Sequence, residues 1–140
     1  MYRTYVVAAD THHCRIYLLE RTSEAVDVHE TFVEQAVLSS DVTEHRGPRL
    51  EQHVNDFARH VVARIRELTE QAPAERVVLV AGPQMLGHLR TAMAGALRAG
   101  VEVTELPHEL TKLHAHELRL QLATHALLPA PPPGPAHASH

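Results

Sequence analysis

The feature that most constrains the fold is one long apolar stripe in the middle of the chain. Between residues 51 and 71, apolar side chains recur at every third or fourth position: Val54, Phe57, Ala58, Val61, Val62, Ile65 and Leu68. This spacing predicts a long amphipathic helix that must bury the stripe against another element. Pro73 ends the helix, and the nearly all-apolar run 76–81 that follows is typical of a central strand buried on both faces.

The residues before this helix predict three strands. Residues 2–9 and 15–19 are rich in β-branched, aromatic and aliphatic side chains, and the turn-like residues 10–13 between them predict an antiparallel hairpin. Val26, Val28 and Phe32 follow a period of two, apart from Glu30, and predict a third strand. Residues 34–50 show no periodicity and are expected to be irregular.

The second half of the chain alternates strands and helices. After Gly82-Pro83, apolar residues at helical spacing predict a second helix that stops at Gly100. Residues 101–105 predict a short strand, and residues 114–127 a third helix. We therefore expect an α/β fold in which one mixed β-sheet combines an N-terminal antiparallel hairpin with later parallel βαβ units.

Length and composition indicate one domain followed by a tail. The chain has 140 residues, enough for one sizeable core, and 44% of them are hydrophobic, which excludes disorder for most of the chain. Five of the nine prolines lie after residue 127. We expect a domain at 1–127 and a disordered or polyproline-like tail at 128–140.

Charge and hydropathy restrict the partners. The formal net charge is −4, so strong non-specific binding to nucleic acid is not expected, and no DNA partner is predicted. The first apolar run is too short for a signal peptide, and no stretch approaches the length of a membrane span. The sequence predicts a cytoplasmic protein without membrane insertion.

Four segments resemble the bacterial host attachment protein family. They are 6–19 (Val-Val-Ala-Ala-Asp10, then Cys14-Arg-Ile-Tyr-Leu-Leu19), 51–61, 76–90 (Arg-Val-Val-Leu-Val-Ala-Gly-Pro-Gln-Met-Leu-Gly-His-Leu-Arg) and 106–118. The resemblance extends over about residues 4–126. That family is related in fold to the middle domain of archaeal and eukaryotic peptide-chain release factors, which implies a mixed α/β sandwich whose functional loop precedes the long helix.

The resemblance does not carry the release-factor activity with it. In release factors the loop holds Gly-Gly-Gln, whose glutamine serves peptidyl-tRNA hydrolysis. Here the corresponding segment reads Arg46-Gly-Pro-Arg-Leu50, and Gly-Gly-Gln occurs nowhere in the chain. We also expect no counterpart of the flanking domains that place a release factor on the ribosome. Peptidyl-tRNA hydrolysis is therefore not expected.

The same segment is the densest positive cluster of the sequence. His45, Arg46, Gly47 and Arg49 precede the long helix, and His53 lies in its first turns. A basic loop on an acidic protein can engage phosphate or a carboxylate. The loop contains no aromatic residue for base stacking, which weakens an RNA interpretation and leaves a solubilising loop as the alternative.

A metal site is the competing chemical hypothesis. His53, Asp56 and His60 lie at i, i+3 and i+7 on the long helix, where three nitrogen and oxygen ligands could hold zinc or another divalent ion. The alternative is a solvated helix flank. His108-Glu109 and His116-Glu117 lack the second histidine of His-Glu-x-x-His. We predict no cofactor and no resident metal.

Nucleophilic chemistry finds little support. Cys14 lies within a predicted strand and is expected to be a small buried residue. Asp10, beside His12 and His13, either assists a base or forms a turn by bonding nearby backbone, and the turn is favoured.

The sequence thus favours a small, non-catalytic binding or regulatory module with a protein or a ribosome/RNA partner. A metal-dependent hydrolase or nuclease using His53, Asp56 and His60 is the alternative. A third hypothesis is a homo-oligomer formed by pairing of edge strands.

Overall fold

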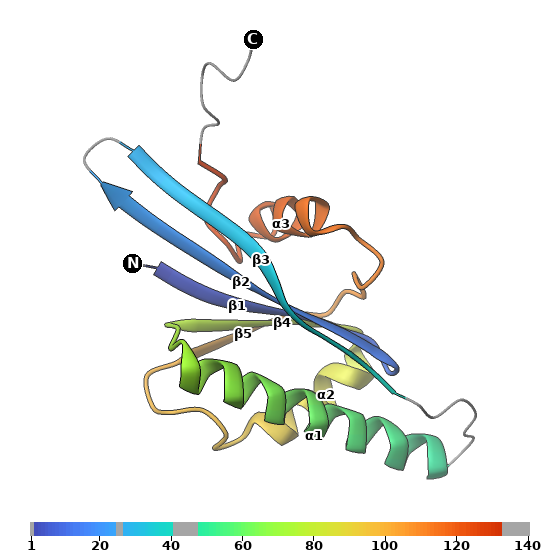
Figure 1. Ribbon diagram of the computed structural model, residues 1–140. Helices are drawn as coiled ribbons and strands as arrows, with labels where there is room; N and C mark the ends of the chain where they lie inside the picture. The colour runs from blue at the N-terminus through green and yellow to red at the C-terminus, as the bar shows by residue number, and fades with distance from the viewer. Residues whose placement is uncertain (1, 25–26, 41–47, 133–140) are drawn as a thin grey trace.

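A computed structural model of the chain describes residues 2–24, 27–40 and 48–132. The elements follow in the order β1 (Tyr2–Ala9), β2 (His13–Glu24), β3 (Asp27–Ser39), α1 (Pro48–Gln71), β4 (Arg76–Ala81), α2 (Pro83–Met93), β5 (Glu102–Leu106) and α3 (Ala115–Thr124). The predicted α/β fold is confirmed, because one mixed sheet is covered by helices on both faces (Figure 1).

The strands form one five-stranded sheet in the order β3-β2-β1-β4-β5. β1 pairs antiparallel with β2 and parallel with β4, and β4 pairs parallel with β5. The predicted hairpin and the predicted parallel units are therefore both present. β1 and β4 occupy the interior of the sheet, which explains why their sequences are nearly continuous apolar runs.

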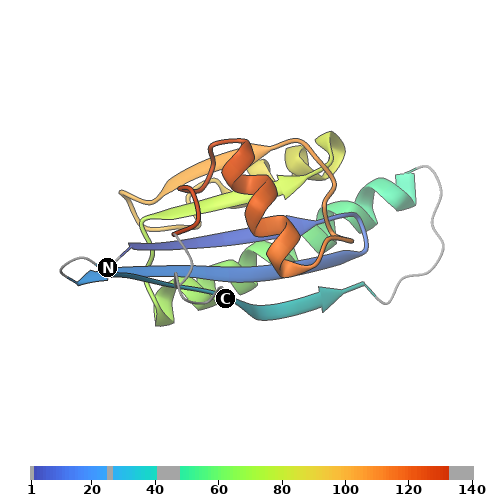
Figure 2. The same cartoon turned by 90° about the horizontal axis from the view of Figure 1, so that it is seen from above.

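The two faces of the sheet carry separate halves of the core. α1 and α2 cover one face, where Val7 and Leu79 pack against Val61 and Ile65. α3 covers the opposite face, where Val78 packs with other side chains of the second half of the chain, and Figure 2 shows this helix lying over the strands. Successive side chains of β1 and β4 point to opposite faces of the sheet, so the same two strands contribute to both halves of the core.

Several predicted boundaries were wrong. Residues 34–39, expected to be irregular, continue β3, and β2 extends well beyond 15–19. The second helix ends at Met93 instead of Gly100; Gly95 follows with φ 73°, a left-handed conformation that favours glycine.

The start of the predicted tail packs against the domain. Leu128 is 3% exposed and belongs to the core beneath α3, and the carbonyl of Ala130 accepts a hydrogen bond from Arg21 (2.6 Å). Packing therefore extends past residue 127, where we placed the boundary. The disordered or polyproline-like tail stays a prediction, and residues 133–140 lie outside the described part.

Candidate functional site

The candidate site lies where β1 and β3 end and the segment leading to α1 begins. β1 delivers Asp10 into the turn that leads to β2, and β3 delivers Ser40 beside that turn. α1 contributes His53, and the segment between β5 and α3 contributes Thr111. We call Asp10, His12, Ser40, His53 and Thr111 the turn cluster.

Asp10 organises the turn between β1 and β2. Its Oδ1 accepts hydrogen bonds from the backbone N–H groups of His12 (2.8 Å) and His13 (2.7 Å), and its Oδ2 accepts one from the Thr111 hydroxyl (2.9 Å). Asp10 is therefore the turn-forming residue that the sequence favoured. The bond to Thr111 also ties the turn to the segment that precedes α3.

The electrostatics of Asp10 follow from these bonds. Partial burial alone would raise its pKa, but the two backbone N–H groups, the Thr111 hydroxyl and the nearby His13 outweigh burial and lower the pKa below its ordinary value. A carboxylate held ionised by three donors is a weak proton acceptor. Asp10 thus acts as a structural anchor and is poorly suited to serve as a general base.

His53 joins α1 to the end of β3. Its Nε2 lies 3.0 Å from the hydroxyl oxygen of Ser40, and its ring centroid lies 5.3 Å from that of His12. The backbone N–H of Ser40 donates to the carbonyl of His12 (2.8 Å). His53 is only 7% exposed, so this predicted binding residue lies inside the protein, in the early turns of α1.

The rest of the predicted binding loop falls mostly outside the described residues. His45, Arg46 and Gly47 belong to the stretch 41–47, of which the structure describes nothing. Arg49 lies in the first turn of α1, and its side chain is likewise outside the described part. What the structure describes are the two points between which this segment runs, the end of β3 and the start of α1.

The three residues of the metal hypothesis do not converge. His53 turns toward Ser40, whereas Asp56 accepts a hydrogen bond from Gln52 (3.0 Å) and His60 is exposed. Over the described ranges, no three His, Cys, Asp or Glu side chains come close enough together to hold a metal ion. His53 is buried beside Ser40, whereas the side chains of Asp56 and His60 are exposed, so the three potential ligands do not share one site.

Cys14 is buried as predicted. It is fully shielded from solvent, and burial, with a smaller contribution from Asp10, raises the pKa of its thiol to about 12. Such a thiol stays protonated at neutral pH and is not a nucleophile.

The turn cluster itself was not predicted as a unit. The sequence linked Asp10 with the neighbouring His12, and His53 with the basic segment, but Ser40 and Thr111 carried no signal. Only the tertiary fold brings these two residues next to His53 and Asp10. The sequence did mark the turn 10–13 and the segment before α1 as special. Their proximity depends on the order of strands in the sheet.

Fold and site together define a single-domain α/β protein with a polar cluster at one end of a mixed sheet. A family model described as "Protein required for attachment to host cells" matches residues 35–122, more than half of the chain. The chain belongs to this host attachment family, as the sequence resemblance predicted. No curated protein matches the chain at significant similarity.

Two solved structures are similar to the chain at low identity. The Thermus thermophilus RuvC structure is 17% identical, with a TM-score of 0.49, and the match covers 93% of this chain and 84% of RuvC. The type II variant of the Aquifex aeolicus Ppx/GppA phosphatase is 14% identical, with a TM-score of 0.43, and the match covers 75% of this chain and 36% of the phosphatase. The relation to the release-factor middle domain stays a prediction.

Among the described residues, no helix is both long enough and apolar enough to cross a membrane.

Proposed function

We propose that this chain is a non-catalytic binding module that works in the cytoplasm. Its working surface is the basic segment around Arg46 and Arg49, at the end of the sheet marked by the turn cluster. Membership of the host attachment family supports an attachment-related role in the cell. That family description names a phenotype, so the molecular partner has to be argued from the chain itself.

The observation that carries the proposal is the anchoring of both ends of this segment. Ser40, directly after β3, and His53, in the early turns of α1, are joined by a hydrogen bond of 3.0 Å. Ser40 is also held by the carbonyl of His12. One end is thus held by the buried His53 and the other by the partly buried Ser40, and fixing the ends of a segment lowers the entropy that it loses on binding.

The chemistry of the segment favours an anionic partner. Its arginines can form bidentate hydrogen bonds with phosphate or carboxylate groups. The whole chain is acidic, with a formal charge of −4, so such binding depends on the local cluster and not on overall charge. The resemblance to release-factor middle domains leads us to choose the ribosome, with its RNA phosphates, as the first partner to test.

The described residues give no support to catalysis at this end of the sheet. Asp10 is engaged by three hydrogen-bond donors, and the thiol of Cys14 is buried with a raised pKa. His53, the group on α1 nearest the turn, is bonded to Ser40. A role in binding uses these residues as a scaffold, which agrees with their burial and their bonding.

Co-sedimentation with ribosomes at low salt tests the proposal. We expect the native chain to sediment with ribosomes and Arg46→Glu with Arg49→Glu to abolish sedimentation, because the two substitutions reverse the charge of the segment. Arg64→Glu with Arg90→Glu makes the same change in net charge at exposed helix positions away from the segment, and it should sediment like the native chain. Unchanged sedimentation of the Arg46 and Arg49 variant would reject the proposal.

A further inference from the structure

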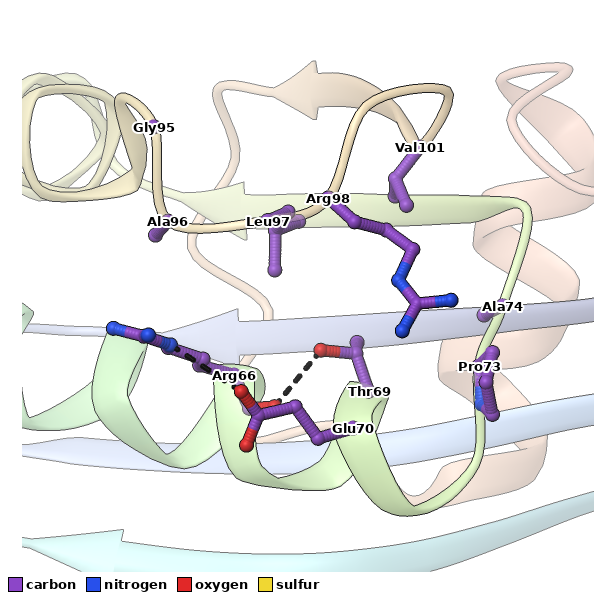
Figure 3. A pocket seen from close by; sticks show the side chains of 10 residues that line it. All are labelled: Arg66, Thr69, Glu70, Pro73, Ala74, Gly95, Ala96, Leu97, Arg98 and Val101. Atoms are coloured by element: carbon purple, nitrogen blue, oxygen red, sulfur yellow. Dashed lines mark hydrogen bonds and ion pairs between the residues drawn. The ribbon is translucent and has the colours of Figure 1, made fainter.

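A groove runs between α1 and the α2–β5 connection, away from the turn cluster. It consists of two adjoining hollows of about 320 and 450 Å³, which share Arg66 and Ala96 as lining residues. Figure 3 shows the first hollow, with the end of α1 on one side and residues 95–101 on the other. Each hollow is within the size range of small-molecule sites.

The arginines of this groove differ from the others of the chain. Arg59 and Arg98 line it, and neither has a hydrogen-bond or ion-pair partner among the described residues. Every other arginine whose side chain the structure describes pairs with a carboxylate. In Figure 3 the side chain of Arg98 reaches from the connection toward α1. The two arginines without a partner in the described part thus both line this groove, and the remaining unpaired cation of that part, Lys112, lies elsewhere.

Arg66 adds a third guanidinium at the junction of the two hollows. It forms an ion pair with Glu70 (3.5 Å), and both side chains are 63% exposed, so the pair is weak and open to exchange. Glu70 is the only carboxylate that lines either hollow among the described residues. Because it lines the same hollow as Arg98, it repels any anion that binds there.

The remaining lining is apolar or neutral. Val62, Ala63, Ala92 and Ala96 line the second hollow, with Asn55 and Thr91 at its polar margin. Of the residues that the structure describes, no aromatic one lines either hollow, which disfavours a single-stranded nucleic acid that needs stacking platforms. An apolar floor beside guanidinium groups suits a ligand with a compact apolar body and a phosphate group.

We propose that this groove binds an organic phosphate, with the phosphate on Arg98 and the body over the apolar floor toward Arg59. The proposal does not rest on the function proposed for the basic segment. The two sites use different residues, so each can fail without the other.

Calorimetric titration with 1-naphthyl phosphate tests the groove. Inorganic phosphate is the comparison probe, because it has the phosphate group without the apolar body. Arg98→Gln should weaken binding of 1-naphthyl phosphate about tenfold or more, because a charged hydrogen-bond partner is lost, and Arg59→Gln should weaken it by less. Glu70→Gln should strengthen binding about twofold to fivefold, because it removes the carboxylate that repels the anion and leaves Arg66 without its ion pair. A gain in affinity cannot result from loss of folding.

Arg64→Gln is the matched control, since Arg64 lies on the same helix outside the groove and pairs with Glu67 (3.1 Å). It should leave affinity unchanged. Three results would overturn the proposal: no saturable binding at about 10 mM 1-naphthyl phosphate, equal weakening by Arg64→Gln and Arg98→Gln, or equal affinity for inorganic phosphate and 1-naphthyl phosphate.

Discussion

Replacing Glu30 with glutamine should destabilise the protein more than any similar change in an exposed ion pair. Glu30 lies on β3 and accepts hydrogen bonds from Arg119 of α3 (2.8 and 2.9 Å) and from Arg21 of β2 (2.9 and 3.2 Å). The side chain of Arg119 is only 5% exposed and that of Glu30 only 11%. This network attaches α3 to the outer part of the sheet.

The magnitude follows from burial. Removing one partner of a buried ion pair leaves an uncompensated charge, at a cost of about 3–5 kcal/mol. Arg119 would keep its charge and lose its carboxylate, and its Nη1 already has no hydrogen-bond partner among the described residues. Because Arg21 is partly exposed, we expect a loss near the lower end, about 3 kcal/mol in the free energy of unfolding.

Urea unfolding followed by far-ultraviolet circular dichroism measures this loss. Glu102→Gln is the matched control, because Glu102 is also on a strand and pairs with Arg76 (2.9 Å), but its side chain is 58% exposed. The control should lose no more than about 1 kcal/mol. If Glu30→Gln lost no more than Glu102→Gln, the argument from burial would be wrong.

The pH dependence gives an independent check. Partial burial alone would raise the pKa of Glu30, but hydrogen bonds and charges from Arg119 and Arg21 outweigh it and hold the pKa below the ordinary value of 4.5. A lowered folded pKa contributes stability above the unfolded pKa and loses it as pH falls through the folded value. The difference between the native chain and Glu30→Gln should be constant from pH 7 to about 5 and shrink below about 4.5.

Three further predictions concern the core. Cys14, fully buried with a thiol pKa raised to about 12, should resist iodoacetamide in the native state at pH 8 and react when unfolded in urea; rapid native labelling would refute its burial. Tyr5→Phe should lower the free energy of unfolding in urea by about 1–2 kcal/mol, because the Tyr5 hydroxyl lies 3.0 and 2.8 Å from the carbonyls of Leu68 and Ala72 near the end of α1. No loss would show that these contacts do not stabilise the fold. Leu79→Ala, at a fully buried position of β4, should lower the free energy of unfolding by about 2–5 kcal/mol in the same assay. A loss below about 1 kcal/mol would contradict the place of Leu79 in the core.

The interior of the fold was predictable because buried elements have recognisable patterns of apolar residues in the sequence. Strands β1 and β4 were predicted with their observed bounds, since both faces of each are covered and the residues form apolar runs. Helix α1 was predicted almost completely, because its apolar stripe faces the sheet while the other side meets water. In both cases one local pattern is sufficient to identify the element.

The edge of the sheet was not predictable in the same way. β3 pairs on one side only, and apolar side chains such as Val33 (54% exposed) and Val37 (63% exposed) lie on its exposed side, so the apolar residues of this strand do not mark one buried face. The register between β2 and β3 also shifts at Ile16 and Tyr17, which breaks any period of two. Residues 34–39 therefore resembled a loop although they form a strand.

The turn cluster shows how far the candidate site could be predicted from the sequence. His53 was identified from its position beside the basic segment, but its partner Ser40 belongs to a segment expected to be irregular. The bond from Thr111 to Asp10 joins residues from opposite ends of the chain. Local sequence patterns can indicate single candidate residues, whereas the order of strands in the sheet determines which of them come into contact.

The salt dependence of ribosome binding tests the central claim most directly. If Arg46 and Arg49 neutralise RNA phosphates, the slope of log affinity against log salt concentration should become shallower by about 1.4 in Arg46→Gln with Arg49→Gln, since each phosphate contact contributes about 0.7 on single strands. Arg64→Gln with Arg90→Gln should keep the native slope. Equal slopes for the native chain and the Arg46 and Arg49 variant would contradict the assignment of the working surface.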